Sequence, residues 1–244
     1  MQAPVLLITP PFTQLNTPYP ATAYIKGFLN AQGVEAYQAD LGIEVILRIF
    51  SKEGLQQVFN YLESDEVDIE LTPQAYSLYA LQKKYLRTID PVIRFLQHQD
   101  PTLAHNICSR SYLPEGSRFH DLKEEDIAWA FGAIGIQDRA RHLATLYLED
   151  LSDFIKEAID PHFGFSRYAE RLGRTATHFE PIAQALQAPE TIVSQILLQE
   201  LDKHLTEHQP KVVCISAPFP GNLFGALKCG QYIKKHYPQI AVAL

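Results

Sequence analysis

The sequence predicts an α/β fold in which a large helical segment interrupts an open parallel sheet. Short, continuous apolar runs stand near both ends of the chain, and such runs are typical of strands that are covered on both faces. A crossover between parallel strands needs only a dozen or so residues, whereas roughly 170 separate the second run from the third. We therefore expect an open parallel sheet, Rossmann-like or flavodoxin-like, with strand order 2-1-3-4 and a helical insertion between strands 2 and 3.

The first unit is a strand, a helix and a second strand. Val5–Thr9 is a strand that Pro10 and Pro11 end, because proline cannot continue a ladder of hydrogen bonds. The helix 21–32 is expected to bury one apolar face, and Gly33 suits its C-terminal cap. That expected face consists of Ala21, Tyr24, Ile25, Phe28 and Leu29. The second strand runs from Val34 to Ala39 and stops at Asp40, so the unit should form a right-handed parallel crossover.

The middle of the chain has helix signals throughout. Ser51 and Thr72-Pro73 have the residue types of helix N-caps and first turns, so helices are expected to run to Glu63 and towards Arg87. Proline in the first helical turn is also expected at three further sites, which are Asp90-Pro91, Asp100-Pro101 and Ala188-Pro189. The longest helix spans 136–158, with an apolar stripe of Leu143, Leu146, Tyr147, Leu151, Phe154 and Ile155.

The last unit again alternates strands with helices. A helix at 189–208 leads into the strand 212–216, a further helix follows, and the chain closes on the strand-like run 240–244. We therefore divide the chain into an α/β domain, residues 1–42 and 189–244, and a helical insertion, residues 43–188. Because 240–244 has no cap or turn after it, we interpret the chain as a piece of a longer protein. We expect another copy of the chain, in a homodimer through this sheet edge, or the chain's own helices to cover the edge.

Composition excludes several classes of function. The 244 residues are 46% hydrophobic and 20% charged, with a net charge of −7, which argues against a nucleic-acid backbone as the main partner. The N-terminus has no basic region, and its apolar run is too short for a signal peptide or a membrane span. The three cysteines are widely spaced, which predicts a reducing cytoplasm, no disulfide framework and no metal knuckle.

Ligands of open parallel sheets bind beyond the carboxyl ends of the strands, where neighbouring connections diverge. Two loops there are alike, each with a small hydroxyl residue, proline and an aromatic residue, and with the order 2-1-3-4 they would be two walls of one crevice. The candidate binding residues are Thr9, Pro10, Pro11, Phe12, Asp40, Ser216, Ala217, Pro218 and Phe219. Stiff loops with few free N–H groups suit an extended planar ligand better than a phosphate. The alternative is that the prolines merely end buried strands.

Other sites are weaker. No Gly-x-Gly-x-x-Gly or P-loop motif follows any strand. This absence counts against a third possible function, an unrelated flavodoxin-like protein that binds a flavin or a nucleotide. Arg167, Arg171 and Arg174 share one helical face, which fits either an anion site or a solvated face. Cys214 lies inside a strand, and its simplest interpretation is a small core residue. No catalytic residue and no metal ligand can be assigned from residue order.

The two end segments together resemble the N-terminal cobalamin-binding-type domain of radical S-adenosylmethionine enzymes, the Fe–S oxidoreductases. The resemblance rests on the segments 6–12, 24–34, 39–41, 213–216 and 233–244, with Pro-Pro after the first strand and Asp-Leu after the second. It implies that this region holds a corrinoid or substrate beside the protein's own C-terminal radical S-adenosylmethionine barrel. The [4Fe–4S] cluster and S-adenosylmethionine would belong to that barrel in the full-length protein, so this chain alone would not be catalytic.

Two departures from the family pattern refine this expectation. The loop after the first strand, 9–14, contains no histidine for a lower axial ligand, which favours either cobalamin bound without a protein histidine or no cobalamin at all. The Cys-x-x-x-Cys-x-x-Cys motif that holds the cluster is absent from the sequence. The alternative function is an α/β scaffold that has lost its ligand, with the helical insertion as a module that docks a substrate or a partner.

Overall fold

The computed structural model describes residues 4–11, 19–63, 70–123, 125, 131–132, 135–164 and 178–244. The chain forms two compact units. Unit 1 comprises residues 1–46 and 162–244, and unit 2 comprises residues 47–161. Compared with the insertion expected at 43–188, the compact helical unit is shorter at both ends, and the segment after residue 161 belongs with the sheet.

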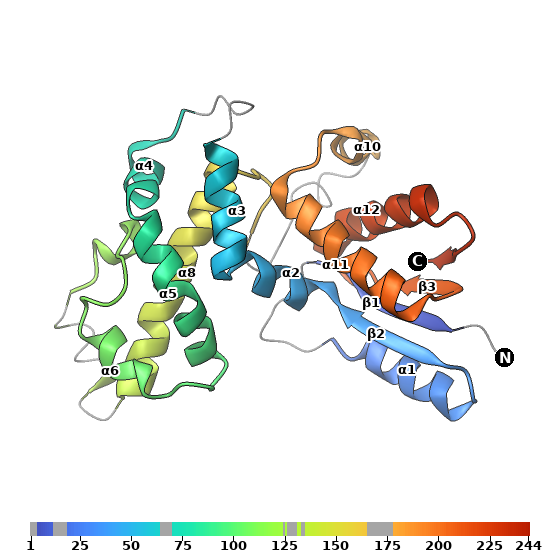
Figure 1. Ribbon diagram of the computed structural model, residues 1–244, viewed down its shortest axis with the longest axis horizontal. Helices are drawn as coiled ribbons and strands as arrows, with labels where there is room; N and C mark the ends of the chain where they lie inside the picture. Colours follow the sequence, from blue (N-terminus) through green and yellow to red (C-terminus); the bar gives the residue numbers. More distant parts are fainter. Residues whose placement is uncertain are drawn as a thin grey trace. The chain divides into compact units, whose positions relative to one another are not determined.

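Unit 1 is an α/β structure around a four-stranded, entirely parallel sheet (Figure 1). The strands are β1 (Val5–Thr9), β2 (Ala36–Asp40), β3 (Val212–Ile215) and β4 (Ala241–Ala243). Their order is β2-β1-β3-β4, which confirms the predicted order. Leu7 of β1 lies between Gln38 of β2 and Cys214 of β3 in the register.

The two faces of the sheet are covered unequally. On one face lie α11 (Ile192–His208) and α12 (Pro220–His236), and α10 (Glu180–Gln187) contacts α12 (Figure 1). On the other face lies α1 (Ala21–Ala31), which contacts β1 and β2. The core between the sheet and α11–α12 is apolar, with Leu6 and Ile8 at 0% exposure and Val213 and Leu201 equally buried.

The predicted buried face of α1 is wrong. Tyr24, Ile25 and Phe28 are 77%, 46% and 65% exposed, and the residue of α1 that is buried against the sheet is Thr22. A polar contact sets this rotation, because Thr22 Oγ1 accepts a hydrogen bond from Gln38 Nε2 at 3.0 Å and lies 3.4 Å from Thr9 Oγ1. Gly33, with φ +77°, ends the helix as predicted.

The expectation that both faces of the last strand are covered is also wrong. Ala241 and Ala243 are exposed and Leu244 is 70% exposed, whereas Ile240 just before the strand is buried. The cause is position, since β4 is an edge strand and the main strand contacts of α1 are with β1 and β2. Within the described residues, β4 pairs with β3 alone. A second copy at this edge stays a prediction.

The helix α2 (Leu41–Ile49) follows β2 without a loop. Asp40 caps it, because its Oδ1 accepts a hydrogen bond from the Ile43 N–H at 3.1 Å, and burial raises the pKa of this carboxyl. One turn later, Glu44 Oε2 lies 2.6 Å from Nε2 of His204 on α11. This hydrogen bond raises the pKa of His204 above its ordinary value of 6.5, and the pair ties α2 to α11.

Unit 2 is helical in the part that the structure describes. Its elements are α3 (Lys52–Leu62), α4 (Pro73–Ala80), α5 (Gln82–Leu96), α6 (Leu103–Cys108), the 3₁₀ turn η1 (Ser117–Phe119) and α8 (Ile136–Ala158). The helix α8 has the predicted bounds, and its predicted apolar stripe is buried apart from the half-buried Leu146. It packs against α4, α5 and α6, and the Tyr85 and Tyr147 rings stack at 5.2 Å in the core.

The helix starts of unit 2 follow the sequence in part. The side chains of Ser51 and Thr72 cap α3 and α4 as predicted, by accepting hydrogen bonds from the backbone N–H three residues on. The expected helix start at Pro91 is wrong, because Pro91 lies inside α5. Burial of Ile89 and Val92 on either side of Pro91 keeps the helix continuous, and the Asp90 side chain accepts a hydrogen bond from Lys52 of α3 instead.

At two other sites the helix begins a few residues later than the proline predicts. Pro101 and Pro189 each stand before a helix, but α6 begins at Leu103 and α11 at Ile192. Thr191 caps α11 with its side chain, so a threonine beyond the proline sets that boundary. Over the described residues, none of the helices has the length and apolar character that crossing a lipid bilayer requires.

We expect the Glu44–His204 pair to make stability depend on pH. Because the pKa of His204 is raised in the folded state, its contribution is fully present below the unfolded pKa near 6.5 and is lost as pH rises through the folded pKa. A double-mutant cycle of Glu44→Gln and His204→Gln, read by urea denaturation, should give a coupling of about 1–2 kcal/mol near pH 6. The coupling should shrink towards pH 9; an equal coupling at both pH values would contradict the assignment.

Candidate functional site

The connections of the sheet diverge between β1 and β3. From β1 the chain passes through α1 to β2 on one side, and from β3 it passes through α12 to β4 on the other. This is the switch point at which open parallel sheets bind ligands. The loops after these two strands are neighbours there, since the Ser216 N–H donates to the Ile8 carbonyl at 2.9 Å.

The loop after β1 is buried where the structure describes it. Pro10 and Pro11 have little exposed surface, and Thr9 is 1% exposed. The Asn222 side-chain amide on α12 donates to the Pro10 carbonyl at 2.8 Å. A Cβ on Gly225 would lie 2.7 Å from the Pro11 carbonyl oxygen, so glycine permits this close approach of helix and loop. Phe12, the fourth candidate of this loop, lies outside the described residues.

The loop after β3 is open. Ser216, Ala217 and Pro218 are half-buried and line a pocket of about 400 Å³. Phe219, which begins α12, is 55% exposed and meets the Tyr19 ring edge-on at 6.1 Å. The remaining lining residues come from β1, β3, β4 and the start of α1, and they are Leu7, Tyr19, Thr22, Ile25, Cys214, Ile215, Ala243 and Leu244.

Sequence reasoning missed most of this lining. Cys214, interpreted from the sequence as a core residue, is half-exposed and lines the pocket, on the face of the sheet where α1 lies mainly over β1 and β2. No signal in the sequence of β3 could have found it, because Val212–Ile215 is apolar throughout; only in the structure are Val213 and Ile215 buried while Val212 and Cys214 are not. Burial still raises the pKa of the Cys214 thiol.

The pocket is suited to binding rather than to acid–base chemistry. Among its described lining residues, the only ionisable side chains are the Tyr19 phenol and the Cys214 thiol. Hydroxyl groups come from Tyr19, Thr22 and Ser216, and the other lining side chains are apolar apart from the Cys214 thiol. Asn222 of α12, which does not line the pocket, is 0% exposed, and its Oδ1 has no hydrogen-bond partner among the described residues. A buried acceptor of this kind requires a donor, such as a water molecule.

Asp40 lies away from this pocket lining. It ends β2, at the opposite edge of the sheet from β4, and caps α2. The three arginines Arg167, Arg171 and Arg174 lie outside the described residues. No group of three or more metal-ligating side chains occurs in the parts of the chain that the structure describes.

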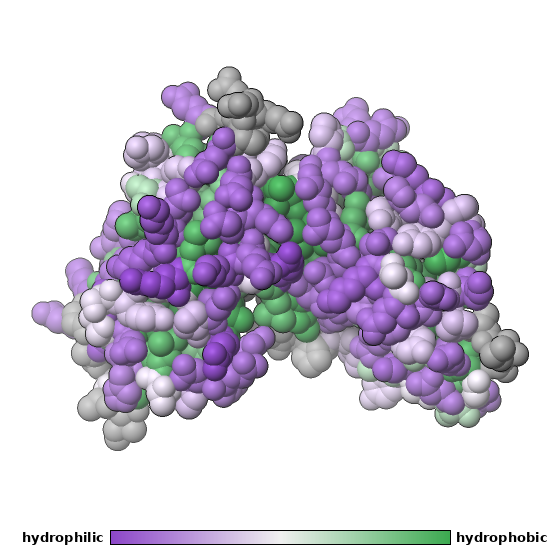
Figure 2. Space-filling view, in the orientation of Figure 1, coloured by the Kyte–Doolittle hydropathy of each residue, from purple (hydrophilic) through white to green (hydrophobic). Residues whose placement is uncertain are grey.

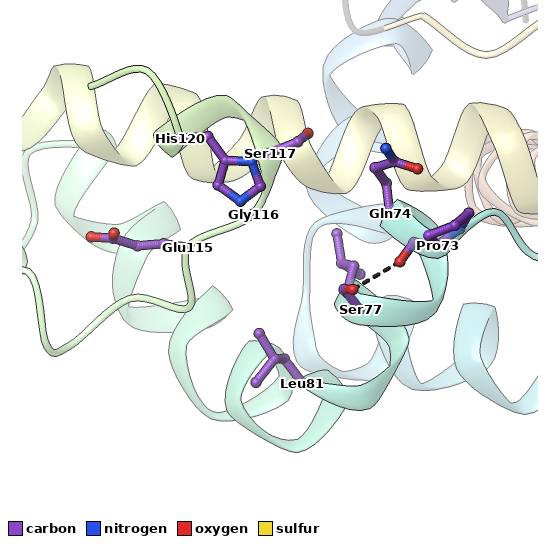
Figure 3. A pocket seen from close by; sticks show the side chains of 9 residues that line it. Pro73, Gln74, Ser77, Leu81, Glu115, Gly116, Ser117 and His120 are labelled. Atoms are coloured by element: carbon purple, nitrogen blue, oxygen red, sulfur yellow. Dashed lines mark hydrogen bonds between the residues drawn. The ribbon is translucent and has the colours of Figure 1, made fainter. Parts of the chain in front are cut away.

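Unit 2 has a second, smaller pocket of about 220 Å³ between α4 and the loop 115–120. Figure 3 shows Gln74 and Ser77 of α4, with Leu81 just after it, on one side and Glu115, Ser117 and His120 on the other. Glu115 is held by a two-pronged ion pair with Arg110, with contacts of 2.5 and 2.8 Å. The Ser77 hydroxyl is used locally, since it donates to the Pro73 carbonyl.

A buried carboxylate holds the loop of this second pocket. Asp150 of α8 is 3% exposed and accepts hydrogen bonds from the Gly116 and Arg118 N–H groups at 2.9 and 3.0 Å. Burial raises the pKa of Asp150, and these two hydrogen bonds oppose the rise. A Cβ on Gly116 would lie 2.6 Å from the Asp150 carboxyl, so the loop requires glycine there.

Comparisons with known proteins add no family to this description. The chain matched none of the protein-family models, and searches of the curated proteins and of the solved structures found no match either.

We expect Asp150→Ala to lower the free energy of unfolding by about 2–3 kcal/mol, because two partly buried N–H groups lose their charged acceptor. The matched control is Asp153→Ala on the same helix, which removes a half-exposed ion pair with Arg118 and should cost less than about 1 kcal/mol. Urea denaturation measures both. Equal losses in the two variants would show that Asp150 does not anchor the loop.

Proposed function

We propose that unit 1 is a ligand-binding domain of the cobalamin-binding type, which holds a corrinoid or a substrate at the carboxyl edge of its sheet. The observation that carries this proposal is the pocket at the switch point, with Ser216, Ala217 and Pro218 on its rim and the exposed face of β3 as its floor. The resemblance of the end segments to radical S-adenosylmethionine enzymes supplies the ligand class. In this proposal the protein acts together with a C-terminal barrel of that family.

The residues of the pocket fit a flat, mainly apolar group that carries amides. Leu7, Ile215 and Ala243 offer apolar contact, while the Ser216 and Tyr19 hydroxyls can meet amide groups at its edge. The volume of about 400 Å³ lies within the range of small-molecule sites, so the pocket can enclose a small substrate but only part of a corrinoid, which is much larger. No histidine lines the pocket among the described residues, and none occurs in the loop 9–14. A corrinoid would therefore be held here without a protein histidine as its axial ligand.

The chain's own cysteines do not fit an iron–sulfur cluster. Cys108, Cys214 and Cys229 lie on three different elements, and Cys229 is fully buried with its pKa raised to about 12. We therefore assign to this chain binding and orientation of the ligand. The [4Fe–4S] cluster and S-adenosylmethionine, and with them the radical chemistry, belong in this proposal to the downstream barrel.

The alternative function is a scaffold without a ligand in unit 1, in which unit 2 docks a substrate or a partner. One observation favours it, namely the second pocket beside a loop that Asp150 holds rigid. Against it, Phe219 is 55% exposed rather than folded into the pocket at the strand ends, and that pocket stays open. We therefore prefer the binding domain.

The test is a titration of the chain with hydroxocobalamin, followed by its visible absorption spectrum. We expect a saturable spectral change with the wild-type chain. Ala217→Trp, which places an indole in the unit 1 pocket, should weaken binding about tenfold or more.

The matched control is Ser77→Trp, which fills the unit 2 pocket in the same way and should leave binding unchanged. An unchanged wild-type spectrum at high micromolar protein would refute cobalamin binding by this chain. Binding that Ser77→Trp abolishes and Ala217→Trp spares would move the site to unit 2.

A further inference from the structure

One row of residues across the sheet forms the floor of the unit 1 pocket. In the register, Leu7 of β1 lies between Gln38 of β2 and Cys214 of β3, and Cys214 lies opposite Ala243 of β4. Residues that are opposite each other in a sheet point to the same face. Leu7, Cys214 and Ala243 line the pocket, whereas Gln38 does not. The amide of this row therefore stands just beyond the floor, on the β2 side.

Thr22 of α1 connects this amide to the pocket. It is 1% exposed and belongs to the pocket lining. Its Oγ1 accepts a hydrogen bond from Gln38 Nε2 at 3.0 Å and lies 3.4 Å from Thr9 Oγ1. A hydroxyl group has one proton and two lone pairs. The Gln38 amide thus occupies one acceptor position of Thr22 and does not use its proton.

The hydroxyls of Thr9 and Thr22 have one proton more than they can use between them. Either hydroxyl can donate to the other, and neither donates to another acceptor among the described residues. Donation from Thr22 would leave the proton of Thr9 unpaired at 1% exposure and outside the pocket lining, which is costly. Donation from Thr9 leaves the unpaired proton on Thr22, where a ligand in the pocket can accept it. The second arrangement is therefore favoured.

The rest of the lining selects for a neutral ligand. None of the described lining residues is Asp, Glu, Lys, Arg or His, so a charged group in this pocket would have no counter-charge. The other face of the sheet differs, because the surface over α11 and α12 in Figure 2 is mainly hydrophilic. A pocket of about 330 Å³ between these two helices has Glu190 and Asp202 in its lining. A neutral, mainly apolar ligand matches the pocket at the strand ends better.

We propose that Thr22 is the specificity-determining residue of the unit 1 pocket, and that it donates a hydrogen bond to the carbonyl oxygen of a neutral amide or ketone. This inference rests on the proposed function, because it assigns the ligand class of the same pocket. The apolar part of the ligand lies over Leu7 and Cys214. Gln38 is a positioning residue, since its amide holds the Thr22 hydroxyl from outside the lining. A ligand without the carbonyl leaves a buried donor unpaired and binds more weakly.

Two bicyclic probes test the proposal, namely 1-indanone, which has a ketone oxygen, and indane, which lacks it. Affinities are measured by ligand-observed NMR titration. Thr22→Val should weaken 1-indanone binding about tenfold and leave indane binding unchanged, because only the ketone loses its donor. Thr22→Ser keeps the hydroxyl and should bind both probes as the wild type does. The matched control is Thr88→Val in unit 2, where the threonine is 0% exposed, and it should change neither affinity.

Several outcomes would overturn the proposal. Equal losses for both probes in Thr22→Val would show that Thr22 only shapes the pocket. A wild-type chain that does not bind 1-indanone at millimolar concentration would also refute it, as would 1-indanone binding that Ala217→Trp does not weaken.

Titration with hydroxocobalamin separates this inference from the proposed function. A chain that binds cobalamin and fails the indanone test keeps the proposed function and loses the role of Thr22. A chain that does not bind cobalamin and passes the indanone test keeps the carbonyl site and loses cobalamin as its ligand.

Discussion

The uneven cover of the parallel sheet is the constraint on which the rest of unit 1 depends. Two long helices, α11 and α12, cover one face, while the other face has α1 over β1 and β2. The hydrogen bond from Gln38 to Thr22, and the contact of Thr22 with Thr9, fix the rotation of α1 through polar groups. As a result, Cys214 on β3 remains accessible, and the aromatic side chains of α1 point to solvent.

This arrangement leaves the pocket at the strand ends accessible on the α1 side of the sheet. The pocket at the strand ends offers hydroxyls and apolar side chains, and its described lining contains no carboxylate or imidazole side chain. Such a lining can hold and orient a ligand but has no side chain for acid–base catalysis. Ile25 of α1 belongs to this lining, whereas Tyr24 and Phe28 of the same helix do not. Unit 2 contributes a pocket of its own, beside a loop that a buried carboxylate holds.

Sequence alone predicted the local elements and the strand order, but not which surfaces are covered. The caps Ser51 and Thr72 and the long α8 were readable, because capping and helical periodicity are properties of neighbouring residues. Pro91 was misread because packing of α5 overrides a local signal. The exposure of Phe28 and Cys214 depends on where α1 lies over the sheet, which no local pattern encodes. The two similar loops also differ: the loop after β3 lines the pocket, whereas Pro10 and Pro11 are buried beside α12. This difference depends on tertiary packing, which the sequences of the two loops do not show.

Protection of Cys214 tests most directly the central claim that the pocket at the strand ends is the binding site. In a Cys108→Ser background, Cys214 should react with a small maleimide at an appreciable rate, while the fully buried Cys229 should not. Cyanocobalamin, whose cobalt already carries cyanide, avoids direct reaction of the metal with the thiol. If the account is correct, saturating cyanocobalamin slows the labelling of Cys214 several-fold. Cobalamin that binds the chain and leaves the labelling rate of Cys214 unchanged would contradict it.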